Sequence, residues 1–206
     1  MAFIKNNAIS GLIGPVVSYN RKGVSLVRSQ CPSIKDHKSV KQLAQRMRMK
    51  LANNFLSSFK SLVKISYGDA EGKDNAYNRA KSMLLKETMV GNYPDISIDC
   101  SLVRMSHDPV SYLIVDSLSY HDDALKMEVH VDPAIRNRRV QLLVVRYCEG
   151  IADFSDMLPL SDNDRYNLSW GKLDQEHGPW HFWLMLYDPL SNHCYGSVYR
   201  YCPASK

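Results

Sequence analysis

The spacing of the apolar residues changes along this chain of 206 residues, from a helical period to strict alternation after about residue 108. In the first half, one stripe at 3.6-residue spacing contains Val40, Leu43, Ala44, Met47, Leu51, Phe55 and Leu62. In the second half, Leu125, Met127, Val129 and Val131 alternate with polar residues, as in a half-buried strand. This order predicts an α+β fold with two regions, residues 1–105 and 106–206.

Residues 1–32 are rich in β-branched side chains and predict a β arm. The runs 16–19 and 24–27 flank Asn20-Arg21-Lys22-Gly23, where Asn can open a turn and Gly can take a left-handed conformation. We therefore expect a hairpin whose tip presents Arg21 and Lys22 side by side.

Two helices should follow this arm and pack as an antiparallel hairpin. The first is expected over about 39–65 and the second over about 75–90, where Gly91 stops it and Pro94 follows. After them, the alternation of Ile96, Ile98 and Cys100 predicts a short strand within 95–104.

The second region is expected to form seven short strands separated by turn residues. These strands are predicted at 111–119, 125–131, 139–147, 154–160, 165–170, 180–187 and 194–201. Their number and spacing indicate an immunoglobulin-like β-sandwich that folds alone, with Trp170 and Trp180 or Trp183 in its core. The Cys–Trp–Cys pattern of antibody domains is absent, which favours a fibronectin-like variant.

Positive charge is concentrated in the first third of the chain. Residues 1–68 contain twelve Lys or Arg and one acid, Asp36, and the 31 residues from His37 to Tyr67 contain no acid. The remaining residues carry a net charge of −6, and those from Ser106 onward carry −5. Because a solvated face normally mixes both signs, this separation predicts a surface that attracts a polyanion or an acidic protein.

Two functions use this separation of charge. The favoured one is a non-enzymatic structural or assembly protein, whose basic N-terminal surface and acidic β-sandwich make protein contacts, including head-to-tail self-association. The alternative is a nucleic-acid-binding protein, with the Arg21/Lys22 hairpin in a minor groove and the basic helix on phosphates. The candidate residues for binding a partner or polyanion are Arg21, Lys22, Arg28, Lys38, Lys41, Arg46, Arg48 and Lys50.

One predicted strand, Trp180–Tyr187, is apolar on both of its faces. Such a strand is most often central and covered on both sides. The alternative is that one face is an interface anchored by Trp180, Trp183 and Tyr187, since Trp and Tyr are favoured at interfaces.

No motif in the sequence predicts catalysis, and we expect no catalytic residue, no cofactor and no small-molecule substrate. The acid-rich turns Asp122-Asp123 and Asp162/Asp164 could gather Ca²⁺, and His193 and Cys194 with Cys148 or Cys202 could bind a soft metal. Turn chemistry and packing account for these residues more simply, so no metal is expected.

The five scattered cysteines predict reduced, mostly buried thiols rather than a disulfide framework. The chain lacks a secretory signal and an apolar run long enough to span a membrane, so the expected location is cytoplasmic or within a larger assembly.

Short segments along nearly the whole chain resemble an uncharacterised family of Bacteroidota proteins named for its unknown function. The matching segments are 11–14, 22–23 with 27–29, 42–46, 55–56, 90–94 with 97–99, and 197–199. The sequence departs from the family pattern at Asn20 and Arg21, where small or aromatic residues are usual, and at Cys100, where Tyr is usual. The resemblance implies the same architecture, a basic β/helical region followed by a β domain, and implies no activity or cofactor.

Overall fold

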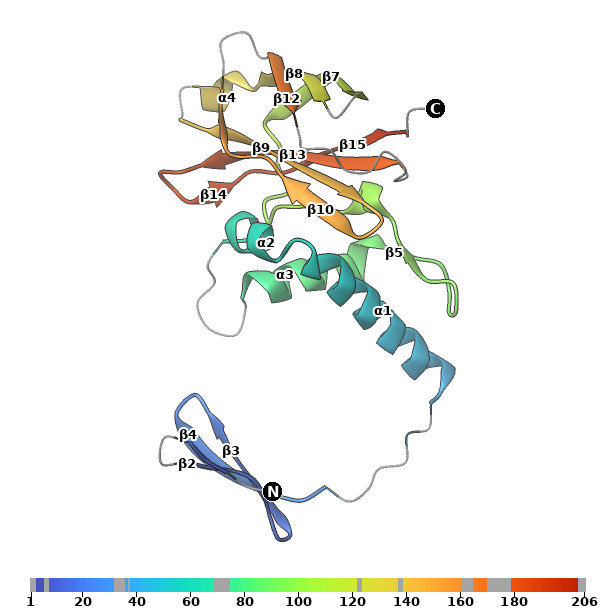
Figure 1. Cartoon of the computed structure of the whole chain (residues 1–206), viewed down its shortest axis with the longest axis vertical. Helices are drawn as coiled ribbons and strands as arrows, with labels where there is room; N and C mark the ends of the chain where they lie inside the picture. Colours follow the sequence, from blue (N-terminus) through green and yellow to red (C-terminus); the bar gives the residue numbers. More distant parts are fainter. Residues whose placement is uncertain are drawn as a thin grey trace. The chain divides into compact units, whose positions relative to one another are not determined.

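The computed structural model describes residues 3–5, 8–31, 36, 38–68, 75–121, 124–136, 139–160, 165–169 and 179–203. Its contacts divide the chain into two compact units, Met1–Ser39 (unit 1) and Val40–Lys206 (unit 2) (Figure 1). The protein is α+β, with a β-hairpin arm in unit 1 and helices followed by antiparallel sheets in unit 2.

Unit 1 is a four-stranded antiparallel sheet in which each strand pairs with the next along the chain. Its strands are β1 (Phe3–Lys5), β2 (Ala8–Ile13), β3 (Val16–Arg21) and β4 (Val24–Ser29). The predicted hairpin is therefore confirmed, but the pairing of Arg21 with Val24 makes its turn only two residues long. Lys22 and Gly23 both have positive φ, 54° and 81°, and the Gly23 amide donates to Asn20 Oδ1 at 3.0 Å. This is the geometry that a twisted two-residue hairpin requires.

The helical part of unit 2 contains more breaks than the sequence predicts. It consists of α1 (Val40–Ser57), α2 (Lys60–Ser66), α3 (Ala76–Met83) and a π-helical turn η1 (Leu84–Thr88). The single helix expected over 39–65 is interrupted at Ser58 and Phe59. Ser57 Oγ donates to the Asn54 carbonyl at 2.6 Å and so competes with the helical ladder, whereas Ser58 Oγ donates outside the helix, to the Gly150 carbonyl at 2.9 Å.

The second helix begins at a side-chain cap and ends before the predicted stop. Asn75 Oδ1 accepts a hydrogen bond from the Asn78 amide at 2.8 Å. The chain leaves helical geometry after Thr88, before Gly91. It then forms a two-stranded ribbon, β5 (Met89–Val90) with β6 (Ser97–Ile98), and a 3₁₀ turn η2 (Cys100–Leu102), so the strand expected within 95–104 is limited to two residues.

Two antiparallel sheets form the rest of unit 2. The first has the order β12 (Arg165–Ser169), β8 (Ala124–Val131), β7 (Leu113–His121). In the second, β9 (Gln141–Cys148) and β13 (Trp180–Asp188) are central. Around them lie β10 (Ile151–Phe154), β11 (Leu158–Pro159), β14 (His193–Cys194) and β15 (Val198–Cys202); a single turn, α4 (Pro133–Arg136), precedes β9. The two sheets face each other as the predicted sandwich.

The central strands β9 and β13 separate two hydrophobic cores. On one side, Leu142, Val144, Phe182 and Leu184 pack against the three-stranded sheet. On the other, Leu143, Val145, Trp183 and Met185 pack against α1, α2 and α3, which cover this face (Figure 1). The prediction of a central strand covered on both sides is confirmed for β13.

The expected boundary at 105/106 lies inside unit 2, because the helices share their core with β9 and β13. Independent folding of residues 106–206 stays a prediction. Trp170, expected in the sandwich core, lies outside the described residues. No helix in the described parts of the chain is both long and apolar enough to cross a lipid bilayer.

Candidate protein-interaction site

One face of the unit 1 sheet combines apolar side chains with two of the predicted partner-binding cations. Paired residues in an antiparallel sheet point to the same side, and neighbours in a strand point to opposite sides. The register pairs Leu12 with Val17, Val17 with Arg28, Tyr19 with Leu26 and Arg21 with Val24. We call the face that results the mixed face of unit 1; it consists of Leu12, Val17, Tyr19, Val24 and Leu26 with Arg21 and Arg28.

The mixed face is largely open to solvent. Leu12 is 42% exposed, Tyr19 37% and Val24 58%. Among residues 10–31, Ser18 alone is buried, and it lies on the opposite face. Unit 1 therefore has no buried apolar core within the residues whose side chains are described, although a sheet of this size needs one covered face to be stable.

The opposite face of the same sheet is more polar. It carries Ile13, Val16 and Val27 among Ser18, Asn20, Ser25 and Ser29. Val27 is 65% exposed and belongs to the same strand as Val24, so the two valines differ mainly in the face they occupy. The turn residues predict the hairpin but not its register, so this difference between the two faces does not follow from them.

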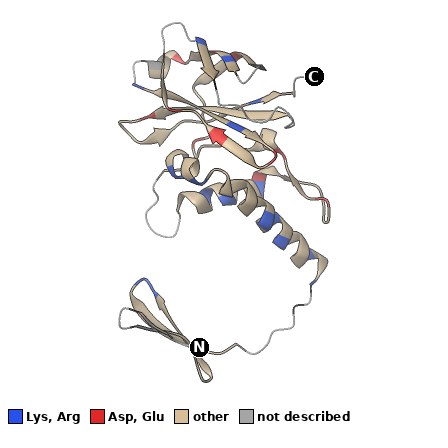
Figure 2. Cartoon of the chain, viewed as in Figure 1, with Lys and Arg blue, Asp and Glu red and all other residues tan. Residues whose placement is uncertain are grey.

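The predicted cations are divided between the two units. Arg21, Lys22, Arg28 and Lys38 belong to unit 1 and are exposed, with Lys22 at the hairpin turn and Lys38 at a positive φ of 44°. The other four, Lys41, Arg46, Arg48 and Lys50, lie on α1, where blue Lys and Arg positions recur along the ribbon (Figure 2).

The four cations on α1 occupy opposite sides of the helix. Lys41, Arg48 and Phe55 follow one another at intervals of seven residues, so Lys41 and Arg48 lie on the side of α1 that is buried at Phe55. Arg46 and Lys50 lie on the other side of the helix. Arg48 is half-buried, and its Nε is buried without a partner among the described residues. The cations of α1 therefore do not form the single stripe that would follow a phosphate backbone.

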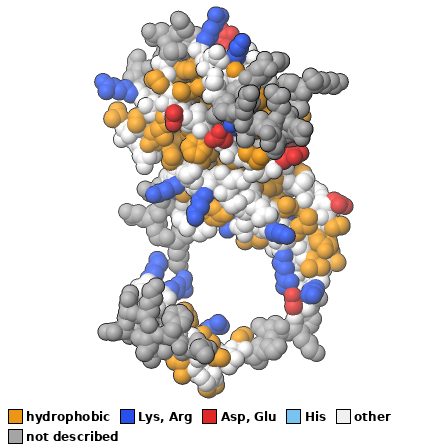
Figure 3. Space-filling model, viewed as in Figure 1, with side chains coloured by type: hydrophobic (Ala, Val, Ile, Leu, Met, Phe, Trp, Pro, Cys, Tyr) orange, Lys and Arg blue, Asp and Glu red, His pale blue; other side chains and the backbone are white. Residues whose placement is uncertain are grey.

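The first half of α1 leaves its apolar stripe only partly covered. Its buried residues are Ala52, Phe55 and Leu56, and Val40 at its start is 67% exposed. Beside this helix, exposed apolar side chains cover the turn between β5 and β6, where Val90 and Tyr93 are each 39% exposed (Figure 3). Unit 2 thus also carries an exposed apolar area, in addition to the mixed face of unit 1.

The two tryptophans proposed as interface anchors belong to the cores of unit 2. Trp180 is 7% exposed and Trp183 is 0% exposed. Trp183 Nε1 donates to the Val103 carbonyl at 2.9 Å, and the Arg146 guanidinium lies 5.4 Å from the Trp180 ring centroid. Tyr187 is half-buried and its hydroxyl donates to Asn192 Oδ1 at 2.9 Å. The alternative prediction, an exposed interface anchored by the two tryptophans, is therefore wrong, because residues of unit 2 cover both indoles.

The residues considered for a soft-metal site do not come together. Cys194 pairs with Tyr187 and Cys202 with Trp180, which places them at opposite ends of β13. His193 Nε2 lies 3.1 Å from Asp108 Oδ2. Within the described residues no three His, Cys, Asp or Glu side chains gather as a metal site, and the turns at 122–123 and 162–164 lie outside those residues.

The five cysteines are described, and no disulfide joins them. Cys148 and Cys194 are buried, Cys100 and Cys202 are half-buried, and Cys31 is exposed, so fewer are buried than the sequence predicts. Burial raises the pKa of the Cys100 thiol to about 11, with a smaller contribution from the Asp99 carboxylate, and raises that of Cys194 to about 12. These two thiols are poor nucleophiles at neutral pH.

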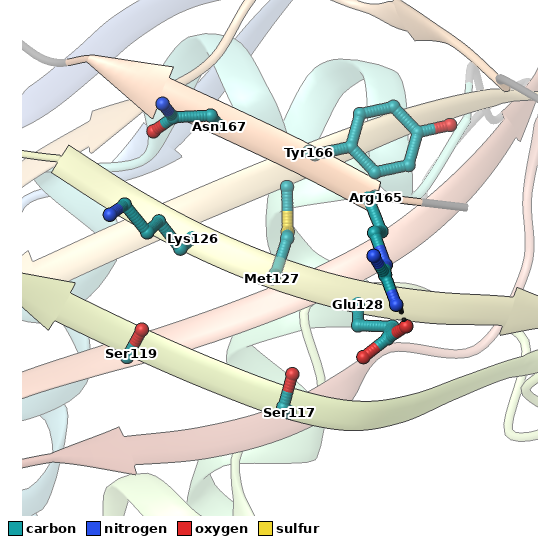
Figure 4. Close-up of a pocket in the computed structure, with 8 residues that line it drawn as sticks. All are labelled: Ser117, Ser119, Lys126, Met127, Glu128, Arg165, Tyr166 and Asn167. Carbon is teal, nitrogen blue, oxygen red and sulfur yellow. Dashed lines mark hydrogen bonds and ion pairs between the residues drawn. The ribbon is translucent and has the colours of Figure 1, made fainter. Parts of the chain in front are cut away.

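A shallow hollow of about 320 Å³ lies on the outer face of the three-stranded sheet (Figure 4). Ser117 and Ser119 from β7, Lys126 and Glu128 from β8, and Arg165 and Asn167 from β12 line it. The Arg165 guanidinium is already paired with Glu128, its Nε lying 2.9 Å from Oε1. The hollow is open and is lined mostly by polar residues, whose charges partly neutralise one another.

Residues 4–117 match the model of a protein family described as "Family of unknown function (DUF6266)". The chain belongs to this family. The DUF6266 match starts within β1, includes β2–β4 and α1–α3, and ends within β7, so it covers the strands of the mixed face and the basic helix. A comparison with curated proteins found no match.

Proposed function

We propose that this DUF6266 protein is a non-enzymatic assembly protein whose unit 1 binds another protein surface through its mixed face. The observation that carries the proposal is the exposure of Leu12, Tyr19 and Val24 beside Arg21 and Arg28 on a sheet that buries no apolar side chain among residues 10–31. An apolar area rimmed by charge is typical of protein contact surfaces.

The free energy that burial of apolar side chains contributes supports docking as the way in which the mixed face of unit 1 becomes covered. Fully burying a large apolar side chain contributes about 1.5–3 kcal/mol, and association costs about 4–15 kcal/mol in lost freedom. The five apolar residues of the mixed face can therefore offset most of this cost only if they are buried together. Arg21 and Arg28 would add electrostatic attraction and select the orientation.

The partner that best complements the mixed face presents apolar side chains together with carboxylates. The chain itself contains an acidic region, since residues from Ser106 onward carry a net charge of −5. We therefore propose a second copy of this chain as the first partner to test. A contact between unit 1 of one copy and the β-sandwich of the next is heterologous, so repetition would give a ring or a filament.

The experiment is size-exclusion chromatography with light scattering, at low and high salt, with and without nuclease. An oligomer that weakens with salt and carries no excess absorbance at 260 nm supports the proposal. Salt weakens the contacts between charged groups, because the screening length falls from about 10 Å at 0.1 M to about 3 Å at 1 M. A monomer under all conditions would contradict self-association.

The same experiment tests the nucleic-acid alternative. Nucleic acid that co-purifies and is released by salt would favour it, since phosphate contacts are strongly salt-dependent. The acid-free helix α1 is the observation in its favour. The placement of the α1 cations on opposite sides of the helix weighs against it.

A further inference from the structure

A hollow of about 250 Å³ lies in unit 2 where the end of α2, one side of α3 and the segment 104–107 meet. It is formed entirely by residues outside the mixed face of unit 1. The described polar side chains that line it are Tyr67, Arg79, Ser82, Lys86, Glu87, Arg104, Ser106 and His107.

The helical spacing brings three of these side chains to one side of the hollow. Ser82 follows Arg79 by three residues and Lys86 follows it by seven, which places them along one face of α3 and its π-helical extension. The opposite side of the hollow is the segment that begins at Arg104.

The lining of the hollow has an excess of positive charge. Among the described residues that line it are three permanent cations, Arg79, Lys86 and Arg104, and one carboxylate, Glu87. Glu87 is already bound by Arg104, whose Nη2 lies 2.9 and 2.7 Å from its two carboxylate oxygens. Arg79 and Lys86 are thus two cations without a balancing carboxylate among the lining residues that the structure describes.

Arg79 has hydrogen-bonding capacity that the described residues do not use. Its Nη2 donates to the Gly68 carbonyl at a long distance of 3.3 Å, and its buried Nε has no partner among the described residues. A buried charged donor without a partner is costly, so an acceptor that binds here is favoured. A guanidinium can give two parallel hydrogen bonds to an oxyanion.

The wall opposite α3 is held in place by buried contacts. Tyr67 is buried, and its hydroxyl donates to the Arg104 carbonyl at 2.8 Å. The His107 amide donates to the Ser66 carbonyl at 3.3 Å, and the His107 ring lies edge-on to Tyr67 with centroids 6.3 Å apart. Arg104 and His107 therefore lie on a fixed wall opposite Arg79 and Lys86, as a binding site requires.

We propose that this hollow binds a phosphate-type oxyanion, either free or as the terminal group of a small molecule. A doubly charged oxyanion matches the two uncompensated cations, whereas a carboxylate would neutralise only one. Arg79 supplies directional donors, Lys86 supplies charge, and the Ser82 hydroxyl and His107 ring supply further polar contacts. The size of the hollow limits the ligand to a small one.

The test is a titration of the full chain with inorganic phosphate at constant ionic strength, with chloride as the reference ion. Binding is monitored through the amide chemical shifts in nuclear magnetic resonance. Saturable shifts at Ser82, Lys86 and His107 are expected. Arg79→Gln should weaken binding by about tenfold or more, the usual scale for a charge-assisted hydrogen bond. Lys86→Gln should also weaken it, and this exposed residue has no role in the core.

Two further variants make the test specific. Glu87→Gln should tighten phosphate binding, because it removes the competing carboxylate from Arg104. Lys64→Gln removes an exposed cation on α2 that does not line the hollow, and should leave binding unchanged. Shifts that do not saturate, or equal binding by the parent and the Lys86→Gln and Glu87→Gln variants, would overturn the proposal.

Titration with glycerol phosphate distinguishes the two sources of the oxyanion. Tighter binding than inorganic phosphate supports a small phosphorylated molecule, and equal or weaker binding supports the free ion. Neither result depends on self-association of the chain.

Discussion

The indole nitrogen of Trp183 donates a hydrogen bond to the Val103 carbonyl over 2.9 Å, at a point where both residues are buried. Trp183 lies at the centre of β13, and Val103 follows the 3₁₀ turn after the helices. Phe59 of the helical layer contacts the same indole, with ring centroids 6.2 Å apart. The helical part and the sandwich are therefore joined by specific contacts as well as by a shared core.

Replacing Trp183 with Phe should lower the free energy of unfolding by about 2–4 kcal/mol, since it leaves a buried carbonyl unpaired and opens a cavity. Trp180→Phe is the matched control. It removes a similar volume from the other core, and Trp180 shows no comparable hydrogen bond among the described residues. Urea unfolding of both variants measures the difference. Equal losses would show that the bond to Val103 contributes little.

The shared core predicts that residues 40–206 fold alone and that residues 106–206 are much less stable. The shorter fragment would expose Leu143, Val145, Trp183 and Met185, which α1–α3 cover. Far-UV circular dichroism and thermal melting of both fragments test this. Cooperative melting of residues 106–206 at a similar temperature would instead support the boundary at 105/106.

The cysteines should react with a thiol reagent in the order of their exposure. In the native protein Cys31 should react first, because it is exposed, whereas buried Cys194, whose pKa is raised to about 12, should react only on unfolding. Five thiols should titrate after denaturation. A disulfide, or rapid native reaction of Cys194, would contradict the burial described for β14.

His181 should make stability depend on pH in the mildly acidic range. Burial lowers the pKa of its imidazole, and Asp99 opposes this more weakly. The unfolded chain, with a pKa of about 6.5, then binds more protons than the folded chain, so stability should fall as the pH decreases below about 6.5. His181→Gln should flatten this part of the curve in urea unfolding at a series of pH values. An unchanged slope would show that other groups cause it.

Most of the fold could be predicted from the spacing of the apolar residues in the sequence. The alternation in 125–131 gave β8, and the two apolar faces of Trp180–Tyr187 correctly indicated a central strand. The domain boundary was harder to predict, because the period of the apolar residues shows that one face of an element is apolar but not which other element covers that face. The helices at 40–88 cover the outer face of β9 and β13, which no local pattern specifies.

The candidate site was only partly visible in the sequence. Counting charges located the basic residues, but their grouping depends on strand register and helix rotation. Register joins Arg21 and Arg28 to the apolar residues of the mixed face, and helix rotation separates Lys41 and Arg48 from Arg46 and Lys50. The oxyanion hollow was missed, because its residues come from three segments whose packing is non-local.

The central claim, that unit 1 associates through its mixed face, is tested most directly by light scattering on Val24→Asp and Val27→Asp. Both valines are exposed, lie in β4 and differ in face, so neither change should unfold the protein. The claim predicts that Val24→Asp shifts the full chain toward the monomer while Val27→Asp keeps the oligomer of the parent. Equal masses for both variants at every concentration would contradict it.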